Sequence, residues 1–377
     1  MYMAPATTGA TLYTIVMIRK AILAIAVAAG MATSCGAARQ PESPANQPAD
    51  THTPTEFRLG ADISGTTADE ARGRFTRDAN GKVTETTRLM KDYGLNGIRL
   101  RVWKNPKDGF SSPEDVLVMA RRAHRLGMDI MIDFHYSDWW ADSGKQNIPA
   151  RWEGLTAEQM RDSLSAHTRE TLKLLKNDGI PVRWVQVGNE TTNGFLWPVA
   201  HLPENMKEYA MLTRAGYDAV KEVYPEAEVI VHLDNGFDQS LYDRVFDGLR
   251  ENGAKWDMIG MSVYPYWAIE GKFRPNANST IRDAIANIRH LKEKYGTDVM
   301  IVETGFDARE PREGKELLAR LIADALNGTD GACRGVWYWA PEINANEAYH
   351  LGAFADDRPT IIMDAYREAA EKLRTAK

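Results

Sequence analysis

Two glutamates stand where short apolar runs end, and carboxyl groups in that position can donate protons or attack an electrophile. Glu190 ends the run WVQVGNE, and Glu303 ends the run VMIVE. A carboxylate that directly follows a buried strand is poorly solvated unless the strand delivers it to a cleft. Hydrolases of glycosidic bonds use two carboxyl groups of this kind. The pair therefore suggests a sugar hydrolase, and the alternative is that both glutamates are structural and form salt bridges.

Short apolar runs alternate with amphipathic helical stretches from residue 57 onward. The predicted strands cover residues 57–63, 97–103, 128–135, 183–188, 228–233, 258–264, 298–303 and 335–339. The predicted helices cover residues 82–93, 113–126, 157–176, 204–223, 239–251, 281–294, 315–326 and 361–373. Strands that alternate with helices pair in parallel, because each helix returns the chain to the same end of the sheet. Eight such units in about 320 residues predict an α/β fold, a single closed (β/α)8 or TIM barrel.

The predicted strand ends carry many of the polar and aromatic residues that could form a site. In a (β/α)8 barrel these ends meet on one face, where the loops after the strands build the active site. A purely structural barrel has no reason to collect so many such side chains there. We therefore predict that a substrate contacts Asp62, Arg101, His135, Asp138, Trp140, Asn189, His232, Asp234, Asn235, Tyr264 and Trp339.

The neighbours of Glu303 suggest how its charge is controlled. Arg99 or Arg101, together with Tyr264, is expected to keep Glu303 ionised. His135 is expected to hydrogen-bond near this carboxylate. A metal-binding role for His135 is disfavoured, because no His or Cys accompanies it at ligand spacing.

The neighbours of Glu190 suggest a second, different environment. Asn189 is placed to hydrogen-bond the sugar hydroxyl next to the reacting carbon, where such bonds tighten in the transition state. His232 is expected to shift the pKa of Glu190 in a direction that depends on its own protonation. The two glutamates are therefore expected to differ in pKa.

The tryptophans divide between core and cleft. Trp184 lies within a predicted strand and is expected in the core, whereas Trp339 follows the last strand and is expected to stack on a sugar ring. Of the adjacent pair Trp139 and Trp140, we expect one to face the cleft and the other the core. Cys333 is expected in or near the core rather than in a catalytic role.

Seven motifs, in this order, resemble those of glycoside hydrolase family 53, the endo-β-1,4-galactanases, over residues 57–373. They are GADIS, RLRVW, DFHYSDWWAD, QVGNE, HLDNG, GMSVYPYW and VETG. The motif around His135 is far more specific than Asn189-Glu190, which many barrel glycosidases share. The resemblance implies that Glu190 is the acid/base, that Glu303 is the nucleophile, and that the mechanism retains anomeric configuration. It also implies an arabinogalactan endo-β-1,4-galactanase acting on β-1,4-galactan side chains of pectin.

The chain departs from the family pattern at two places. Ser143 follows the third motif where the family often has proline, and Trp339 is followed by Ala-Pro-Glu342 where the family usually has Glu-Pro. The second change puts substrate length preference and any bound ion in doubt. The resemblance allows calcium in this loop, with Asp356 and Asp357 as oxygen ligands, but adjacent carboxylates lack ligand spacing. No cofactor or metal is therefore predicted.

The overall charge narrows the possible partners. The net charge is -6, the isoelectric point is near 5.8, and no run of Lys and Arg exceeds two residues. These values argue against binding to nucleic acid or to an anionic membrane surface through a basic patch. A neutral polysaccharide fits better, and we expect the catalytic domain to be monomeric.

The first 35 residues resemble an export signal of the lipoprotein type. Arg19-Lys20 precede an apolar stretch at 21–29, and small residues lead to Cys35, although Met17 is as plausible a translation start as Met1. We predict that Cys35 is lipidated; an ordinary secretory signal with an incidental cysteine is the alternative. Residues 36–56 are predicted to be a flexible linker and residues 57–377 the catalytic domain. An exported bacterial protein, anchored to the membrane at the cell surface or in the periplasm, is expected.

Two other functions remain open from the sequence. The first is another endo-β-glycanase of the same barrel clan, such as a mannanase or glucanase, because Asn189-Glu190 and Glu303 would perform the same chemistry there. The second is a glycan-binding lipoprotein that has kept the barrel and lost catalysis. Retention of both glutamates argues against the second.

Overall fold

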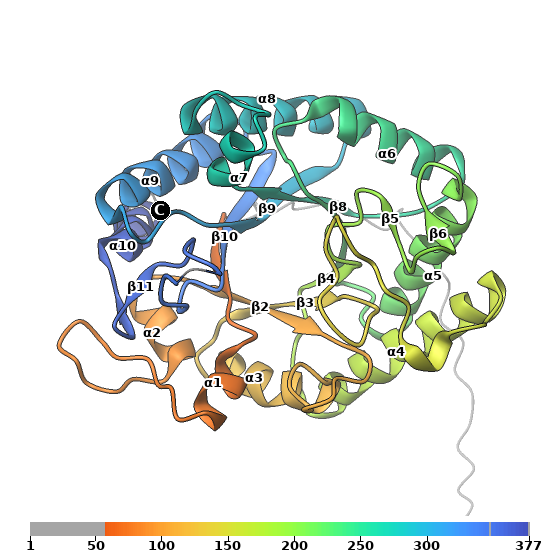
Figure 1. Ribbon diagram of the computed structural model, residues 1–377, viewed down its shortest axis with the longest axis horizontal. Coiled ribbons are helices and arrows are strands. Elements are labelled where there is room, and N and C mark those ends of the chain that lie inside the picture. The colour runs from red at the N-terminus through yellow and green to blue at the C-terminus, as the bar shows by residue number, and fades with distance from the viewer. Residues whose placement is uncertain (1–56, 347, 376–377) are drawn as a thin grey trace, which may run out of the picture. The chain divides into compact units, whose positions relative to one another are not determined.

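The computed structural model describes residues 57–346 and 348–375, and these residues form a closed barrel of parallel strands with helices around it (Figure 1). Neighbouring strands pair in chain order, and the last strand pairs with the first to close the barrel. The strands are β1 Arg58–Asp62, β2 Gly97–Val102, β3 Asp129–Phe134, β4 Trp184–Val187, β7 Glu228–Leu233, β8 Met258–Val263, β9 Asp298–Thr304 and β10 Cys333–Trp339. The prediction of a single (β/α)8 barrel is confirmed.

A ring of helices covers the outside of the strands. It contains α2 Thr86–Asp92, α3 Pro113–Arg125, α4 Ala157–Asn177, α5 Met206–Val223, α6 Gln239–Glu251, α8 Ala277–Tyr295, α9 Pro311–Asn327 and α10 Asp364–Thr375. The loops add short elements: α1 Thr66–Ala71, α7 Pro265–Glu270, β5 Gly194–Phe195 with β6 Ala200–His201, β11 Phe354–Ala355 with β12 Arg358–Pro359, and two single 3₁₀ turns at Ala150–Trp152 and Ile361–Met363. In the described part of the chain, no helix combines the length and apolar character that spanning a membrane requires.

Local sequence signals explain where several helices begin. Thr156 accepts a hydrogen bond from the backbone of Gln159, whose side chain bonds back to Thr156, so a capping box starts α4. The helix predicted from residue 82 begins only at Thr86, because the side chain of Glu85 caps the backbone N–H groups of the first turn. The short helices α1 and α7 were not predicted, since six residues are too few to show a helical period.

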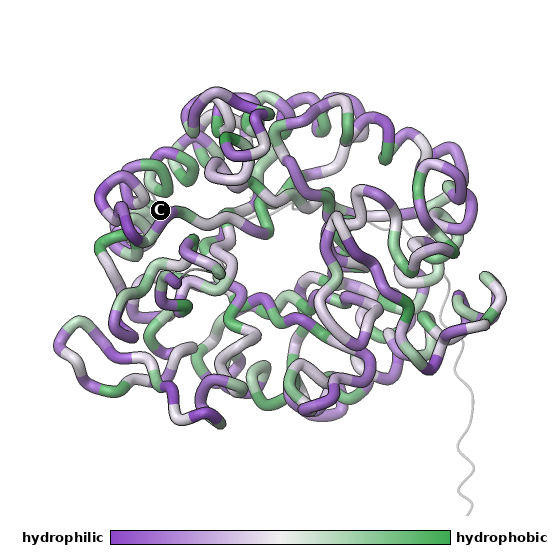
Figure 2. The backbone as a smooth tube through the Cα atoms, viewed as in Figure 1, coloured by the Kyte–Doolittle hydropathy of each residue, from purple (hydrophilic) through white to green (hydrophobic). Residues whose placement is uncertain are grey.

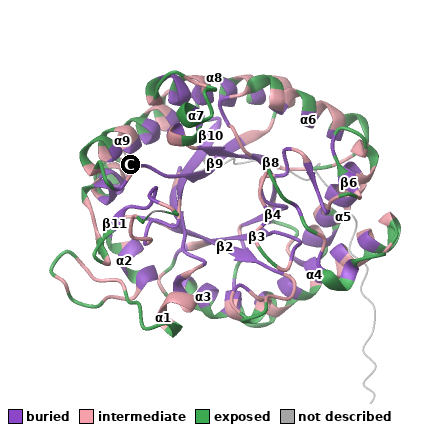
Figure 3. Ribbon diagram, in the orientation of Figure 1, coloured by how far each residue is buried: buried purple, intermediate pink, exposed green. Residues whose placement is uncertain are grey.

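The helices present alternating hydrophobic and hydrophilic positions along their length (Figure 2), and their buried residues face the strands (Figure 3). Burial of the apolar face is what holds such helices on a barrel, because their intrinsic propensity alone is marginal. In α4, for example, Leu164, Thr168, Leu172 and Leu175 are all buried. This spacing of three or four residues is the helical period.

The barrel interior is filled by a cluster of large side chains. Trp184 and Trp337 lie at its centre with ring centroids 5.8 Å apart in an edge-to-face arrangement. The core position predicted for Trp184 is confirmed. Cys333 is also buried, and burial raises the pKa of its thiol to about 11, as a core residue requires. The predicted packing role of Cys333 is therefore confirmed.

Trp337 fits because the strands beside it carry glycine. A Cβ atom added to Gly60 would lie 2.3 Å from the Trp337 ring, and one added to Gly97 would lie 2.5 Å from it. We expect Gly60→Ala to lower the free energy of unfolding by about 1–3 kcal/mol through overpacking. Gly65→Ala is the matched control, because its nearest neighbour, an oxygen of Glu342, would be 3.9 Å away. Equal stability of both variants in urea titrations would contradict this packing account.

Candidate active site

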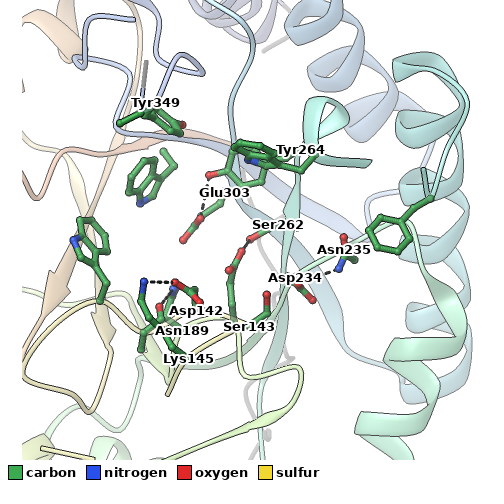
Figure 4. Close-up of a pocket in the computed structure, with 17 residues that line it drawn as sticks. Asp142, Ser143, Lys145, Asn189, Asp234, Asn235, Ser262, Tyr264, Glu303 and Tyr349 are labelled. Atoms are coloured by element: carbon green, nitrogen blue, oxygen red, sulfur yellow. Dashed lines mark hydrogen bonds and ion pairs between the residues drawn. The ribbon is translucent and has the colours of Figure 1, made fainter. Parts of the chain in front are cut away.

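A cavity of about 650 Å³ opens at the carboxyl ends of the strands, and both Glu190 and Glu303 line it. Figure 4 labels Glu303 among the side chains that face the cavity. Its walls come from the loops and strand ends that follow β3, β4, β7, β8, β9 and β10. The predicted residues that line it are Trp140, Asn189, Asp234, Asn235, Tyr264 and Trp339. The structure thus brings the two glutamates and six predicted substrate contacts to one cavity.

Glu303 is held between a cation and a phenol. Nη2 of Arg99 lies 2.9 Å from Oε1 of Glu303, and the hydroxyl of Tyr264 donates to Oε2 over 3.1 Å. Burial raises the pKa of Glu303 to about 7, while Arg99 and the Tyr264 hydroxyl oppose the rise. Arg99 and Tyr264 therefore stabilise the ionised form, as predicted for Tyr264 and for one of the two arginines.

Arg99 is fully buried and organises the floor of the cavity. Its guanidinium lies 2.7 Å from Asp62 and 2.9 Å from Asp133, and it donates to the side-chain oxygen of Asn189 over 2.7 Å. Burial opposes ionisation of Asp133, but Arg99 and His135 hold the pKa of that carboxyl at about 2. Because one guanidinium contacts both Asn189 and Glu303, their positions are linked.

Glu190 occupies a different environment on the opposite wall. The hydroxyl of Ser262 donates to Oε1 of Glu190 over 2.6 Å, which Figure 4 marks as a dashed line from Ser262. Burial raises the pKa of Glu190 well above its usual value, and the charges of Glu303 and Asp234 raise it further. Glu190 has no cation comparable to Arg99 among these causes, so it retains its proton at a pH where Glu303 has lost its own.

Ser262 links the two glutamates through the strand register. It lies opposite Glu303 in the β8–β9 pairing, where a one-residue irregularity follows Met261. Neighbouring strands are about 4.8 Å apart. Ser262, which hydrogen-bonds Glu190, therefore lies on the strand next to the one that carries Glu303.

His232 reaches Glu190 through Ser262. The backbone N–H of Glu190 donates to Nδ1 of His232 over 3.3 Å, and Nε2 lies 2.9 Å from the Ser262 hydroxyl. A backbone N–H can only donate, so Nδ1 accepts and Nε2 carries the hydrogen. Burial and the charge of Arg99 lower the pKa of His232 well below its usual value. His232 is therefore neutral and acts on Glu190 through the Ser262 hydroxyl.

The backbone at Glu190 is held in a sparsely populated conformation. Gly188 has a φ of 91°, and a Cβ there would lie 2.4 Å from Thr191. Glu190 itself has a φ of 44°, which costs a non-glycine residue about 1–3 kcal/mol and is found mainly at functional sites. This sharp turn aims the Glu190 side chain back over the barrel mouth.

Five predicted substrate contacts do not line this cavity: Asp62, Arg101, His135, Asp138 and His232. His135 lies 3.0 Å from Asp133 through Nε2 and accepts from the backbone of Ala141 through Nδ1. Asp138 accepts from the backbone N–H groups of two loop residues, Asn105 and Ala150. Neither side chain lines the cavity, so their contact with a substrate stays a prediction.

Arg101 forms no ion pair with Glu303 within the described residues, unlike Arg99. Its guanidinium carbon lies 4.3 Å from the ring centroid of Trp103 and 3.8 Å from that of Trp140, and it donates to the Ser111 hydroxyl over 3.0 Å. Of the two arginines considered, Arg99 is therefore the partner of Glu303. Arg101 instead supports the position of Trp140 from behind.

The adjacent tryptophans both lie outside the core. Trp139 is 53% exposed, and Trp140 is half-buried and lines the cavity. The expectation that one of them faces the core is therefore wrong. The loop after β3 leaves the barrel at this point, and alternation of side chains no longer applies beyond a strand end. Trp339 lines the cavity beside Tyr349, with ring centroids 5.0 Å apart.

Several residues of the site were not singled out from the sequence. Ser262 and Tyr349 line the cavity. Beneath it, Asp133 pairs with Arg99, and Gln186 hydrogen-bonds both Arg99 and His232. Asp133, Gln186 and Ser262 are polar residues inside otherwise apolar strands. Their position in the quoted motifs was the available signal.

Asp356 and Asp357 form a turn between the short strands β11 and β12. Both have positive φ, 51° and 60°, as the central residues of a tight hairpin turn require. Asp357 accepts from the amide of Asn344 over 2.7 Å. No cluster of three or more His, Cys, Asp or Glu side chains suited to a metal ion occurs among the residues that the structure describes.

Comparison with known proteins identifies the family. The profile described as glycosyl hydrolase family 53 matches residues 58–372. The chain belongs to glycoside hydrolase family 53. It is therefore a glycoside hydrolase, and the resemblance seen in the sequence motifs is confirmed.

Named relatives of this family 53 enzyme come from fungi and bacteria. It is 30% identical to the probable arabinogalactan endo-β-1,4-galactanase A of Neosartorya fischeri, over 79% of this chain and 87% of that one. It is 28% identical to the endo-β-1,4-galactanase of Bacillus subtilis, over 76% of this chain and 70% of that one.

Solved structures share the barrel. The family 53 catalytic domain of Ignisphaera aggregans superposes with a TM-score of 0.75 at 26% identity, over 85% of this chain and 98% of that chain. A fungal β-1,4-galactanase superposes with the same score at 24% identity, over 82% of this chain and 98% of that chain. At this identity the second comparison supports the fold alone.

Proposed function

We propose that this glycoside hydrolase is an arabinogalactan endo-β-1,4-galactanase that cleaves the β-1,4-galactan side chains of pectin. The names of its relatives support the substrate. The observation that carries the chemistry is the contrast between two carboxyl groups facing one cavity. Glu303 is paired with Arg99, whereas Glu190 has no cationic partner among the residues that the structure describes and bonds a hydroxyl.

This contrast supports one carboxyl group that donates a proton and one that is ionised, and we propose the double displacement with retention of configuration that the family resemblance implies. Ionised Glu303 attacks the anomeric carbon while protonated Glu190 gives its proton to the leaving oxygen. Glu190 then takes a proton from the water that hydrolyses the glycosyl–enzyme bond. Asn189, fixed by Arg99 and by its bond to the backbone of Ala141, is placed to hold the neighbouring sugar hydroxyl.

Ser262 is proposed to tune the proton affinity of Glu190. Its hydroxyl stabilises the ionised carboxylate, so Ser262→Ala should raise the pKa of Glu190. The alkaline limb of the kcat/KM profile, where Glu190 loses its proton, should then move to higher pH by about one unit. Ser262→Thr keeps the hydroxyl and should leave the limb in place. A limb that stays fixed or moves downward in Ser262→Ala would contradict this role.

The function is tested by reducing-end assays on linear galactan, mannan and cellulosic substrates. We expect turnover of galactan alone, and early release of mixed oligomers if cleavage is internal. Activity on mannan or glucan without activity on galactan would overturn the proposed substrate. Release of a single small product from the start would overturn the proposed internal cleavage.

We also propose that the enzyme is exported, is anchored to the bacterial membrane through lipidated Cys35, and works as a monomer. The signal, Cys35 and the linker at 36–56 lie outside the described residues, so this proposal rests on the sequence of the first 56 residues. An anchored position suits an enzyme that meets a polysaccharide outside the cytoplasm.

A further inference from the structure

Gln186 is a buried amide on β4 whose hydrogen bonds connect the surroundings of the two catalytic glutamates. Its side chain is fully buried beneath the cavity. Its oxygen accepts from Nε of Arg99 over 2.6 Å, and its amide nitrogen lies 3.0 Å from Nδ1 of His232. Arg99 forms the ion pair with Glu303, and His232 contacts the backbone of Glu190. Gln186 therefore joins the support of one glutamate to the support of the other.

The chemistry of its neighbours fixes which way the amide of Gln186 points. The guanidinium of Arg99 can only donate, so the amide oxygen must face it. The amide nitrogen is then turned toward His232 and toward Asp133, whose Oδ1 accepts over 3.2 Å. Burial opposes ionisation of Asp133, but Arg99 and His135 hold its pKa at about 2, so this carboxylate can only accept. A reversed amide would set a donor against Arg99 and an acceptor against Asp133.

Nδ1 of His232 lies between two donors and one acceptor. The donors are the Gln186 amide and the backbone N–H of Glu190, at 3.0 and 3.3 Å. The acceptor is Oδ1 of Asn189 at 3.1 Å, which also accepts from Arg99 over 2.7 Å. Without the Gln186 amide, the acceptor would lie nearer to Nδ1 than the one remaining donor. The amide is thus the contact that favours an Nδ1 without hydrogen.

The position of the hydrogen on His232 decides where the Ser262 hydroxyl points. With the hydrogen on Nε2, the imidazole donates to Ser262 over 2.9 Å, and the hydroxyl donates to Oε1 of Glu190 over 2.6 Å. With the hydrogen on Nδ1, Nε2 can only accept, and the hydroxyl would donate to His232 instead. A hydroxyl has one hydrogen and cannot do both. The carboxylate that Glu190 becomes after it gives up its proton would then lose this donor.

We propose that Gln186 is a positioning residue that keeps the hydrogen of His232 on Nε2 and thereby directs the Ser262 hydroxyl at Glu190. Gln186 does not line the cavity, so it acts on the reaction only through its neighbours. This inference rests on the proposed function, because it gives the proton-donating role to Glu190.

The hydrogen on His232 can be located by nitrogen NMR, because protonated and unprotonated ring nitrogens resonate far apart. The enzyme carries isotope-labelled histidine at all eight positions, and the signals that vanish in His232→Asn are those of His232. We expect hydrogen on Nε2 alone in the wild type at neutral pH. Hydrogen on Nδ1 in the wild type would overturn the proposal.

Gln186→Glu exchanges the donor that faces His232 for an acceptor and keeps an oxygen for Arg99. The introduced carboxyl group has at most one hydrogen, which ionised Asp133 attracts more strongly than a neutral imidazole does. We therefore expect hydrogen on Nδ1 of His232 in this variant. An Nδ1 that stays without hydrogen would overturn the proposal.

Asp62→Asn is the matched control. It also exchanges a carboxylate and an amide beside Arg99, where Asp62 accepts from Nη1 over 2.7 Å, but within the described residues Asp62 has no hydrogen bond to His232. The hydrogen of His232 should stay on Nε2 in this control. A move to Nδ1 here as well would mean that any disturbance of Arg99 has this effect, and would overturn the specific role of Gln186.

The pH profile of galactan cleavage tests the consequence for Glu190. Gln186→Met removes the amide without adding charge. It leaves in place the charged and titratable groups around the two residues, which are Glu303, Asp234 and Asp142 near Glu190, and Arg99, Asp133 and His135 near His232. We expect the alkaline limb of kcat/KM to move up by about one unit, as in Ser262→Ala, and to move no further in the double variant. A limb that stays in place in Gln186→Met, or shifts that add in the double variant, would show that Gln186 does not act through Ser262.

Failure of this inference is separable from failure of the proposed function, because the ring nitrogens are observed without substrate. A wild type that leaves galactan intact overturns the function, and the hydrogen on His232 can still be located. An active wild type whose His232 signals are unchanged in Gln186→Glu overturns only the role of Gln186. If Gln186→Glu does not fold, the spectrum of Gln186→Met decides: hydrogen on Nδ1 supports the proposal, and its absence contradicts it.

Discussion

Replacing Glu303 by glutamine is expected to lower kcat on galactan by about 10⁴-fold, because the amide cannot form the glycosyl–enzyme bond and the two-step path is lost. The glutamine can still accept from Tyr264, and Arg99 keeps Asp62 and Asp133 as partners. The loss should therefore appear in kcat with little change in fold. Initial-rate measurements on linear galactan provide the value.

The matched control for Glu303→Gln is Glu228→Gln. Glu228 begins β7 at the amino end of the barrel, where its carboxylate accepts from Trp184. Activity of this control should stay within about twofold of wild type. A Glu303→Gln enzyme that retains a tenth or more of the wild-type rate would refute the nucleophile assignment.

The same variant should be more stable than the wild type at neutral and alkaline pH. Glu303 has a folded-state pKa of about 7, above the value of about 4.3 in an unfolded chain. The folded state therefore binds this proton more tightly, and ionisation destabilises the fold as pH rises between these two values. Glutamine removes that cost, by up to about 4 kcal/mol. Thermal midpoints should diverge above about pH 7 and converge below about pH 4.

Replacing Glu190 by alanine is expected to lower kcat/KM on galactan by about 10³-fold, because the leaving sugar oxygen departs without a proton. A dinitrophenyl galactoside has a leaving group that needs no proton, so its first step should survive. Its turnover should then be limited by hydrolysis of the intermediate and rescued by azide, which fits the space left by the carboxyl group. The fall of kcat/KM at alkaline pH, which in the wild type reflects deprotonation of Glu190, should disappear.

Equal losses on galactan and on the dinitrophenyl substrate would contradict the acid/base role. Absence of azide rescue together with an unchanged pH profile would do the same. Ser262→Ala offers a useful comparison, because it perturbs Glu190 without removing it and should shift the alkaline limb rather than abolish it.

The barrel fold could be predicted from the sequence, and so could the position of the site at the carboxyl ends of the strands. Both follow from the periodicity of apolar residues. Strand-length apolar runs and helical periods alternate, and eight such units favour a closed barrel of parallel strands over an open sheet. Strand ends then locate the site. Glu190 and Glu303 were found this way, since each ends a run that would otherwise be buried.

The choice between Arg99 and Arg101 could not be made from the sequence. The two residues are two positions apart on one strand and point to the same face. Their depth in the barrel depends on the register, in which Arg99 lies opposite Asp62 and Arg101 lies opposite Asp133. Register in a closed barrel is a property of all eight strands together.

Ser262 was missed for a related reason. An irregularity in the β8–β9 pairing shifts the register after Met261 and brings Ser262 opposite Glu303. Such irregularities redirect side chains and leave little trace in one sequence.

Covalent trapping of the nucleophile tests the central claim most directly. The enzyme is incubated with a dinitrophenyl galactobioside whose hydroxyl next to the anomeric carbon is replaced by fluorine, which slows release of the sugar from the enzyme. Mass spectrometry of the digested protein then locates the label. A single fluorogalactobiosyl group on the peptide that contains Glu303 is the predicted result. A label on Glu190 or another residue, or an active enzyme that is never labelled, would contradict the account.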